Sequence, residues 1–262
     1  MCTLAVAWRV DRRWPIVVAA NRDERLGRPA EGWALRAASS PAPLRGAKEV
    51  RGQAGGGGVR MVAPRDARAG GTWIGLSARG VFAGLTNYHA PLDWYPDLSR
   101  RSRGELVGLA LAAGTAAAAR DALRGADAAR WNPFHLLVAD PRDAFLWWYD
   151  GERTELVELA PGLHVVTERS PVGACPRGDL VRARWPMDPT PVRLRELLTV
   201  HEPPPECATC IHRDPEYGTR SSAVLRVAGE VGASELYAAD ARPCTAPLED
   251  RSDLVAALGR SA

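Results

Sequence analysis

A cysteine stands at position 2 of this chain, directly after the initiator methionine, and it is one of only five cysteines among 262 residues. A methionine that precedes so small a residue is normally removed, so we expect Cys2 to carry a free α-amino group. A thiol has an ordinary pKa of about 8.5 and an α-amine one of about 7.7–8.0, so both groups titrate close to neutral pH. The amine can accept the proton of its own thiol, which makes Cys2 a candidate nucleophile with its own base.

A block of polar residues, Asn21-Arg22-Asp23-Glu24, follows an apolar run that is typical of a buried strand. An N-terminal nucleophile needs a carboxylate that orients its amine, and a nearby cation favours the uncharged amine. Arg22 and Asp23 could supply these two charges beside Cys2. The same residues also fit a simpler interpretation, in which the block is a polar turn at a strand end and Cys2 is a small buried thiol.

The elements that must position these groups begin with a predicted β-hairpin. Residues 2–10 and 14–20 are rich in small, aromatic and β-branched side chains, and Asp11-Arg12-Arg13 between them supplies a turn. Antiparallel pairing of the two segments would bring Cys2 to the polar block.

The rest of the chain predicts further hairpins around a central pair of helices. Strand pairs are expected at 73–76 with 81–88, 134–140 with 144–150, 154–160 with 163–168, and within 221–240. Helices are expected at 102–125, capped by Ser102 and split at Gly114, and at 191–200. This order predicts an α+β fold, with stacked antiparallel sheets and helices packed outside, and it disfavours a βαβ dinucleotide-binding fold.

We expect one domain over residues 1–262, with a long flexible surface loop within 37–71, where alanine, glycine, proline and arginine dominate. The 46% hydrophobic residues suffice for a core, and the arginines are scattered, so the net charge of +3 does not indicate nucleic-acid binding. The sequence shows neither a secretory signal nor a membrane span, which predicts a cytoplasmic protein with reduced thiols. The expected partner is a small-molecule substrate or hydrophobic ligand, and no oligomeric state is indicated.

Seven stretches of the sequence resemble the NRDE family, which is typified by transport and Golgi organisation protein 2. They are MCTLAVAW, AANRDE, APRDARAGGTWIGL, FAGLTNYH, SRGELV, the short Cys210-Ile211-His212 and YGTRSSAVL, in the family's order from position 1 to about 225. That family is similar in turn to the N-terminal nucleophile (Ntn) hydrolases of the choloylglycine hydrolase and penicillin V acylase branch. The resemblance implies a four-layer αββα sandwich, an N-terminal cysteine after loss of Met1, and cleavage of linear amide bonds.

The resemblance also implies roles for individual residues. Cys2 matches the nucleophile of that branch. Arg22 and Asp23 lie where the branch keeps an arginine and an aspartate, although here the two are adjacent. Asn87, in GLTNY, matches an asparagine at a strand end that helps to hold the oxyanion.

Two further positions are expected to contact the substrate, and one segment differs from the residues that the resemblance implies. Asn21 of the polar block and Arg220 of GTRSS are predicted to bind substrate, with Arg220 serving as a second cation near the thiol or near a substrate carboxylate. A second asparagine of the branch is expected around VVTERSP, where this chain has Glu168 and Arg169.

The function that these resemblances imply is hydrolysis of a linear amide or thioester of a small acyl compound, with Cys2 as nucleophile and with no cofactor. The alternative is a non-catalytic protein that binds and moves haem, a lipid or an acyl-CoA in the same cleft, because relatives in the NRDE family have been linked to haem movement and to lipid metabolism.

A second group of cysteines invites a metal or redox interpretation. Cys207 and Cys210 form a C-x-x-C pair with His212 nearby, but a structural zinc site needs four ligands, and Cys175 and Cys244 stand isolated in the sequence. The residue between Cys210 and His212 also breaks the C-x-x-C-H signature of haem attachment. A surface turn with incidental thiols is therefore favoured over a zinc module or a redox pair, and no metal site is predicted.

Overall fold

Two antiparallel sheets face each other in the computed structural model, which describes residues 2–38, 58–89, 96–169, 175–201, 207–213 and 215–260. The six-stranded sheet has the order β10 (Gly162–Thr167), β1 (Cys2–Trp8), β2 (Ile16–Arg25), β11 (Tyr217–Val227), β12 (Glu235–Ala239) and β13 (Glu249–Asp250). The seven-stranded sheet has the order β3 (Ala30–Ala38), β4 (Val59–Asp66), β5 (Ile74–Ser77), β6 (Phe82–Asn87), β7 (Phe134–Ala139), β8 (Ala144–Tyr149) and β9 (Thr154–Glu158).

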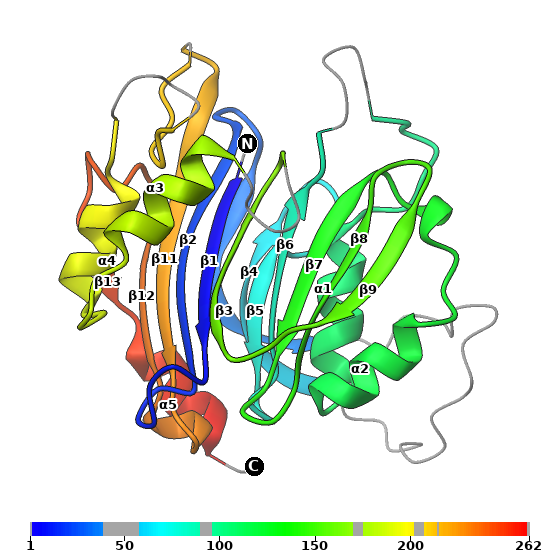
Figure 1. Ribbon diagram of the computed structural model, residues 1–262, viewed down its shortest axis with the longest axis horizontal. Helices are drawn as coiled ribbons and strands as arrows, with labels where there is room; N and C mark the ends of the chain where they lie inside the picture. The colour runs from blue at the N-terminus through cyan, green and yellow to red at the C-terminus, as the bar shows by residue number, and fades with distance from the viewer. Residues whose placement is uncertain are drawn as a thin grey trace.

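Helices cover the outer face of each sheet. Helices α1 (Gly104–Ala112) and α2 (Ala116–Leu123) pack on the seven-stranded sheet, and α3 (Pro176–Arg184) and α4 (Pro191–Leu198) pack on the six-stranded sheet (Figure 1). Helix α5 (Ser252–Gly259) lies at one end, against β12 and β4. The predicted four-layer αββα sandwich is therefore confirmed.

Side-chain alternation along β1 explains how one strand packs both against the other sheet and against the helices outside. Leu4, Val6 and Trp8 point into the core between the sheets, and Ala5 and Ala7 point to the helices α3 and α4. Because both faces of the strand are covered, the sequence of β1 is a continuous apolar run. Trp147 and Trp148 show the same alternation on β8: the first packs toward α1 and α2, and the second packs against the inter-sheet core.

The first hairpin forms as predicted, but its second strand is longer than expected. Strand β2 continues through the polar block to Arg25, so the block is part of the sheet and not a turn that follows it. Pairing with β11 from Ile16 to Arg25 gives the backbone of these polar residues its hydrogen-bond partners, with a bulge between Thr219 and Ser221. The bulge lies directly beside Arg22 and Asp23.

The segment 37–71 includes the strand β4, and the long loop predicted within the segment stays a prediction, because residues 39–57 lie outside the described residues. The structure corrects one other expectation. Strands β9 and β10, predicted to extend one sheet, belong to different sheets, so the chain crosses between the sheets near Gly162. Helix α3 was not predicted because its sequence, PRGDLVRAR, is mostly polar.

The central helical pair forms with the predicted break. Gly114 separates α1 from α2 with a φ of 87°, a conformation that favours glycine. The predicted cap is corrected: Arg103, not Ser102, occupies the N-cap of α1, and the clear side-chain cap is that of Thr115 on α2. Among the described residues, no helix combines the length and the apolar character that spanning a membrane requires.

Candidate active site

Cys2 opens onto a cavity of about 310 Å³ at the ends of the central strands. Strands β1 and β2 supply Cys2 and the polar block, β6 supplies Asn87, and the start of α1 supplies the opposite wall. The lining includes Cys2, Arg22, Asp23, Glu24, Arg28, Asp66, Trp73, Asn87, Asp97, Arg100, Arg101, Arg103 and Asn132. A cavity of this size suits a small organic molecule.

The register of the first hairpin brings the thiol and a guanidinium together. Cys2 pairs with Arg22 across β1 and β2, and paired residues in antiparallel strands point to the same face. The Cys2 Sγ lies 3.8 Å from the backbone oxygen of Asp23. Burial raises the pKa of the Cys2 thiol above its ordinary value, and the positive charge of Arg22 acts in the opposite direction.

Glu168 lies beside the backbone nitrogen of Cys2. The Cys2 N–H donates to Glu168 Oε2 at 3.3 Å, and Arg177 Nη1 donates to the same oxygen at 3.0 Å. The side chains of Glu168 and Arg177 are both only 2% exposed. Glu168 therefore occupies, with a carboxylate, the position where the resemblance implied an asparagine, and it contacts the nitrogen that loss of Met1 would turn into an α-amine.

Asp23 lies on the opposite face of β2 from Arg22, because neighbouring residues of a strand alternate. Its Oδ1 accepts a hydrogen bond of 2.6 Å from Thr219 Oγ1, while its buried Oδ2 has no hydrogen-bond partner among the described residues. Burial raises the pKa of the Asp23 carboxyl to about 7. The structure thus gives the site two buried carboxyl groups, and the one that accepts from the Cys2 nitrogen is Glu168.

Arg22 is held by an aromatic ring and two carboxylates. Its guanidinium lies 4.1 Å from the centre of the Trp73 ring, and its Nη2 lies 3.6 Å from Glu24 and 3.7 Å from Asp66. Its buried Nη1 has no hydrogen-bond partner within the described parts of the chain. The arrangement fixes a cation on the same face as the Cys2 thiol.

Asn87 ends β6 and lines the same cavity as Cys2. Its side-chain amide makes no hydrogen bond to another described residue, so it is available to a ligand. Arg103 reaches the cavity from the N-cap of α1 and donates to the backbone oxygen of Pro133 at 3.0 Å. Burial lowers the pKa of Arg103 to about 10, at which it still carries its charge at neutral pH.

The two predicted substrate-binding residues are placed differently. Asn21 is buried, and its Nδ2 donates to the backbone oxygens of Leu198 at 2.9 Å and Thr209 at 2.8 Å. Its Oδ1 accepts from Ser222. Asn21 thus connects the end of α4 and the loop that contains Thr209 to β2, and its role in substrate binding stays a prediction.

Arg220 donates through Nε to the backbone oxygen of Arg28 at 3.0 Å, and it is absent from the described lining of the cavity. The two positions therefore differ from Cys2, Arg22, Asp23 and Asn87, which the structure brings to one cavity.

Sequence reasoning missed three contributors to this region. Glu168 was noted only as a departure from a family pattern, although its place at the end of a predicted strand was a usable signal. Arg103 and Thr219 lie in two of the stretches that carry the family resemblance, but the sequence did not show their contacts, because these depend on how distant elements pack. The expectation that Cys244 is isolated is also corrected, since its sulfur lies 3.6 Å from that of Cys210.

Solved structures with the same architecture define the class to which the fold belongs. An ortholog of N-acylethanolamine-hydrolyzing acid amidase from Caenorhabditis elegans superposes with a TM-score of 0.56 at 15% identity, over 85% of this chain and 92% of that one. The C2A mutant of conjugated bile acid hydrolase from Clostridium perfringens gives 0.53 at 10% identity, over 92% and 89%. Penicillin V acylase from Agrobacterium tumefaciens gives 0.51 at 15% identity, over 92% and 83%. The fold is that of the Ntn hydrolases.

The sequence itself places the chain more narrowly. It belongs to the Transport and Golgi organisation 2 family, which it matches over residues 1–186. The homologue from Bos taurus is 32% identical over 155 residues, and that from Homo sapiens is 29% identical over 157 residues. Each match covers 57% of this chain and 49% of the relative, so the matched part spans about half the length of these relatives. The predicted family is therefore confirmed.

Proposed function

We propose that this protein is a cysteine Ntn hydrolase that cleaves a linear amide or thioester of a small acyl compound. The observation that carries the proposal is the placement of Cys2, whose sulfur faces a cavity with Arg22 while its nitrogen lies 3.3 Å from Glu168. The hydrolases with a similar fold support the reaction class. One of them was studied as a C2A mutant, so a cysteine also stands at position 2 of that protein.

The proposed reaction needs Met1 to be absent, so that the nitrogen of Cys2 becomes an amine. That amine takes the thiol proton, the sulfur adds to the acyl carbon, and Asn87 donates to the resulting oxyanion. The C–N or C–S bond then breaks as the proton passes to the leaving group. Water hydrolyses the acyl–sulfur bond in a second addition, which releases the acid and restores the thiol.

The two carboxyl groups around the amine have different proposed tasks. Glu168 accepts one of its hydrogens and is fixed by Arg177. Asp23 interacts electrostatically with Cys2, and its Oδ2 is a buried acceptor that the described residues leave unused. An α-amine has more hydrogens than the peptide N–H, so a second acceptor beside it suits the processed terminus.

The cavity wall favours a substrate with an anionic group. Carboxylates also line the cavity, and they pair with Arg22 (Glu24 and Asp66) and with Arg100 (Asp97). Arg103 lines it too, and it forms no ion pair with another described residue. A carboxylate or phosphate on the substrate would supply the missing partner. The same feature fits the alternative function, a carrier of an acyl-CoA or another anionic lipid that binds without turnover. In both cases we propose a cytoplasmic location, where the five cysteines stay reduced.

A measurement of turnover distinguishes the hydrolase from the carrier. Protein with verified loss of Met1 is incubated with fluorogenic N-acyl amides and acyl thioesters, alongside Cys2→Ala and the control Cys207→Ser. Release of the leaving group by wild type and control, with at least about a 100-fold loss in Cys2→Ala, is expected for the enzyme. Saturable binding of acyl-CoA without turnover would support the carrier. Haem titration that gives a Soret shift without turnover would support the haem-binding variant of that function.

A further inference from the structure

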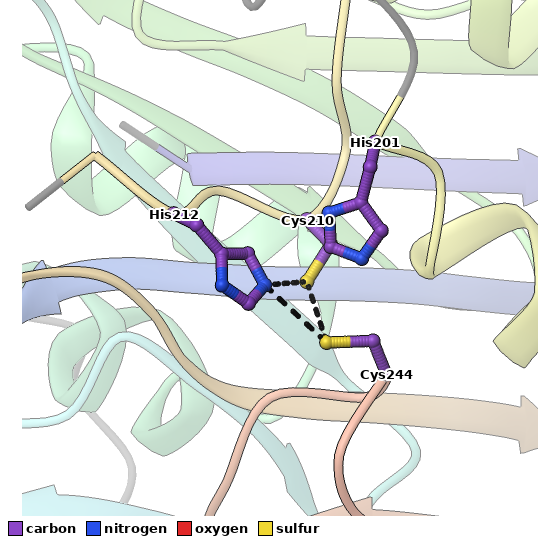
Figure 2. A group of neighbouring side chains, drawn as sticks. All are labelled: His201, Cys210, His212 and Cys244. Carbon is purple, nitrogen blue, oxygen red and sulfur yellow. Dashed lines mark hydrogen bonds between the residues drawn. The ribbon is translucent and has the colours of Figure 1, made fainter.

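Four potential metal ligands meet at a site that is separate from the proposed catalytic groups. His201 follows α4, Cys210 and His212 precede β11, and Cys244 follows β12. Each offers one ligand atom, and these four atoms all lie within 4.8 Å of one another. Figure 2 shows the two sulfurs and the His212 ring directed at a common point, with the His201 ring beside them.

The spacing of the atoms fits tetrahedral coordination. The Cys210 and Cys244 sulfurs are 3.6 Å apart, and His212 Nε2 lies 3.6 Å from the first and 3.3 Å from the second. Zinc bonds of about 2.3 Å to sulfur and 2.0–2.1 Å to nitrogen give tetrahedral edges of about 3.8 Å between sulfurs and about 3.6 Å between sulfur and nitrogen. Three of the ligand atoms therefore stand near their ligating positions, and the ligand atom of the exposed His201 lies within 4.8 Å of them.

A disulfide explains this arrangement less well. A sulfur–sulfur bond is about 2.05 Å long, far below the observed separation, and it would leave the contacts of His212 with both sulfurs unexplained. Two thiolates and two imidazoles are a ligand set that selects zinc over calcium or magnesium. Cys210 is buried while both histidines are exposed, so the ion has a route from solvent.

We propose that His201, Cys210, His212 and Cys244 bind one zinc ion, or a similar soft divalent ion, in a structural site. With four protein ligands the coordination is complete, which leaves no position for substrate. The ion joins the connection between α4 and β11, which supplies three of the ligands, to the turn after β12, which supplies Cys244. Cys207, the other half of the C-x-x-C pair, takes no part in the cluster.

Hydrogen bonds connect this site to the candidate active site. The Ile211 N–H, between the two ligands of one segment, donates to Thr219 Oγ1 at 2.8 Å, and the Thr219 N–H donates to the Ile211 oxygen at 2.9 Å. Thr219 Oγ1 in turn donates to Asp23 Oδ1 at 2.6 Å. The ion thus fixes the segment that positions Thr219, and Thr219 orients the carboxyl group of Asp23.

The metal content of the purified protein tests the proposal directly. Elemental analysis of protein grown with zinc is expected to give about one zinc per chain, and Co(II) is expected to give thiolate-to-metal charge-transfer bands and tetrahedral d–d bands. Cys210→Ser and Cys244→Ser should lose at least about 90% of the metal and the charge-transfer bands, whereas Cys207→Ser should keep both. Sub-stoichiometric metal with no cobalt spectrum, or equal binding by all three variants, would overturn the proposal.

A measurement on unmutated protein keeps the test independent of folding defects. Cys210 and Cys244 should resist alkylation in the zinc-loaded protein and become labelled after a chelator is added, while labelling of Cys207 stays unchanged. Chelation should also lower the Tm by roughly 5 °C, because the ion binds the folded chain and not the unfolded one. A Cys210–Cys244 disulfide in freshly purified protein, or no change on chelation, would contradict a metal site.

Discussion

Arg22 and Asp23 are neighbours in the sequence, yet they act on different sides of the strand. Arg22 shares a face with the thiol of Cys2, and Asp23 points to the other face, where Thr219 donates to it. The backbone nitrogen of Cys2 is a third group of the site, and it donates to Glu168. In the proposed mechanism, the residue that acts on the thiol therefore differs from the residue that orients the amine, so each effect can be tested alone.

Arg22→Gln should make the Cys2 thiol harder to ionise. The variant removes one of the charges that oppose the effect of burial, so the pKa of the thiol should rise further. Mass spectrometry of iodoacetamide labelling across the pH range should show the Cys2 midpoint move upward and its rate at pH 7 fall about threefold. The control Arg153→Gln, at a side chain that is 80% exposed on a distant hairpin, should match wild type. An unchanged midpoint would show that Arg22 does not act on the thiol.

Asp23→Asn should flatten the dependence of stability on pH. Because the pKa of Asp23 is raised from 3.8 to about 7, the folded protein holds a proton that the unfolded chain has lost. This contribution is complete below pH 4 and is lost as the pH rises through 7, at about 1.4 kcal/mol per pH unit. Urea unfolding at intervals from pH 4 to 8 should show this fall in wild type and in the exposed control Asp121→Asn, and not in Asp23→Asn. An equal slope in all three proteins would exclude a raised pKa.

At the scale of elements, the candidate active site depends on hydrogen bonds that connect the segment around Thr209 to β2. Asn21 holds the backbone oxygens of Leu198 and Thr209 together, directly behind the strand that carries Arg22 and Asp23. The proposed zinc site fastens the following residues of the same loop. The hydrogen bonds of Asn21 and the proposed zinc site therefore both hold one segment against β2, the strand whose polar block lies within the sheet.

Asn21→Ala should destabilise the protein by about 2–4 kcal/mol. The change leaves two buried carbonyl groups without the donor that satisfies them, and each such loss costs roughly 1–3 kcal/mol. Ser222→Ala, which removes only the hydroxyl that donates to Asn21, should cost about 1 kcal/mol. Denaturant unfolding measures both changes. A smaller loss for Asn21→Ala than for Ser222→Ala would contradict the bracing role.

The junction of α1 and α2 offers a matched pair of glycine substitutions. At Gly114 the φ of 87° disfavours any side chain, and a Cβ would lie 2.7 Å from Arg79 Nη1. At Gly108, inside α1, a Cβ meets no atom within 4 Å. Thermal unfolding should show that Gly114→Ala destabilises by about 1–2 kcal/mol, whereas Gly108→Ala is neutral or stabilises by up to about 1 kcal/mol. A reversal of this order would show that the helical break is not required.

At the scale of the whole molecule, the sequence predicted those elements that depend on residues close together in the chain. Hairpins such as β1–β2, β5–β6 and β7–β8 follow from apolar alternation and from turn residues that lie within a few positions of each other. The family resemblance, and not periodicity, supplied the four-layer arrangement. The long strand β2 was cut short in the prediction because polar residues within a strand lower its apparent β character, although pairing with β11 satisfies them.

Contacts between distant segments were beyond sequence reasoning. Cys244 lies 34 residues beyond Cys210. The hairpin predicted within 221–240 forms as β11 and β12, but nothing in the sequence shows that the segments on either side of this hairpin bring the two sulfurs together. In the same way, Glu168 reaches Cys2 only because β10 crosses to the other sheet and pairs with β1. Both sites are therefore products of topology, which local sequence patterns do not determine.

The central claim is that Cys2 forms the amino terminus and carries the acyl group during turnover. Intact-mass and peptide mass spectrometry of the purified protein, before and after a rapid quench with an acyl thioester, test this claim most directly. We predict that Met1 is absent and that one acyl group is found on Cys2. Protein that keeps Met1, or an acyl group found elsewhere than on Cys2, would contradict the account.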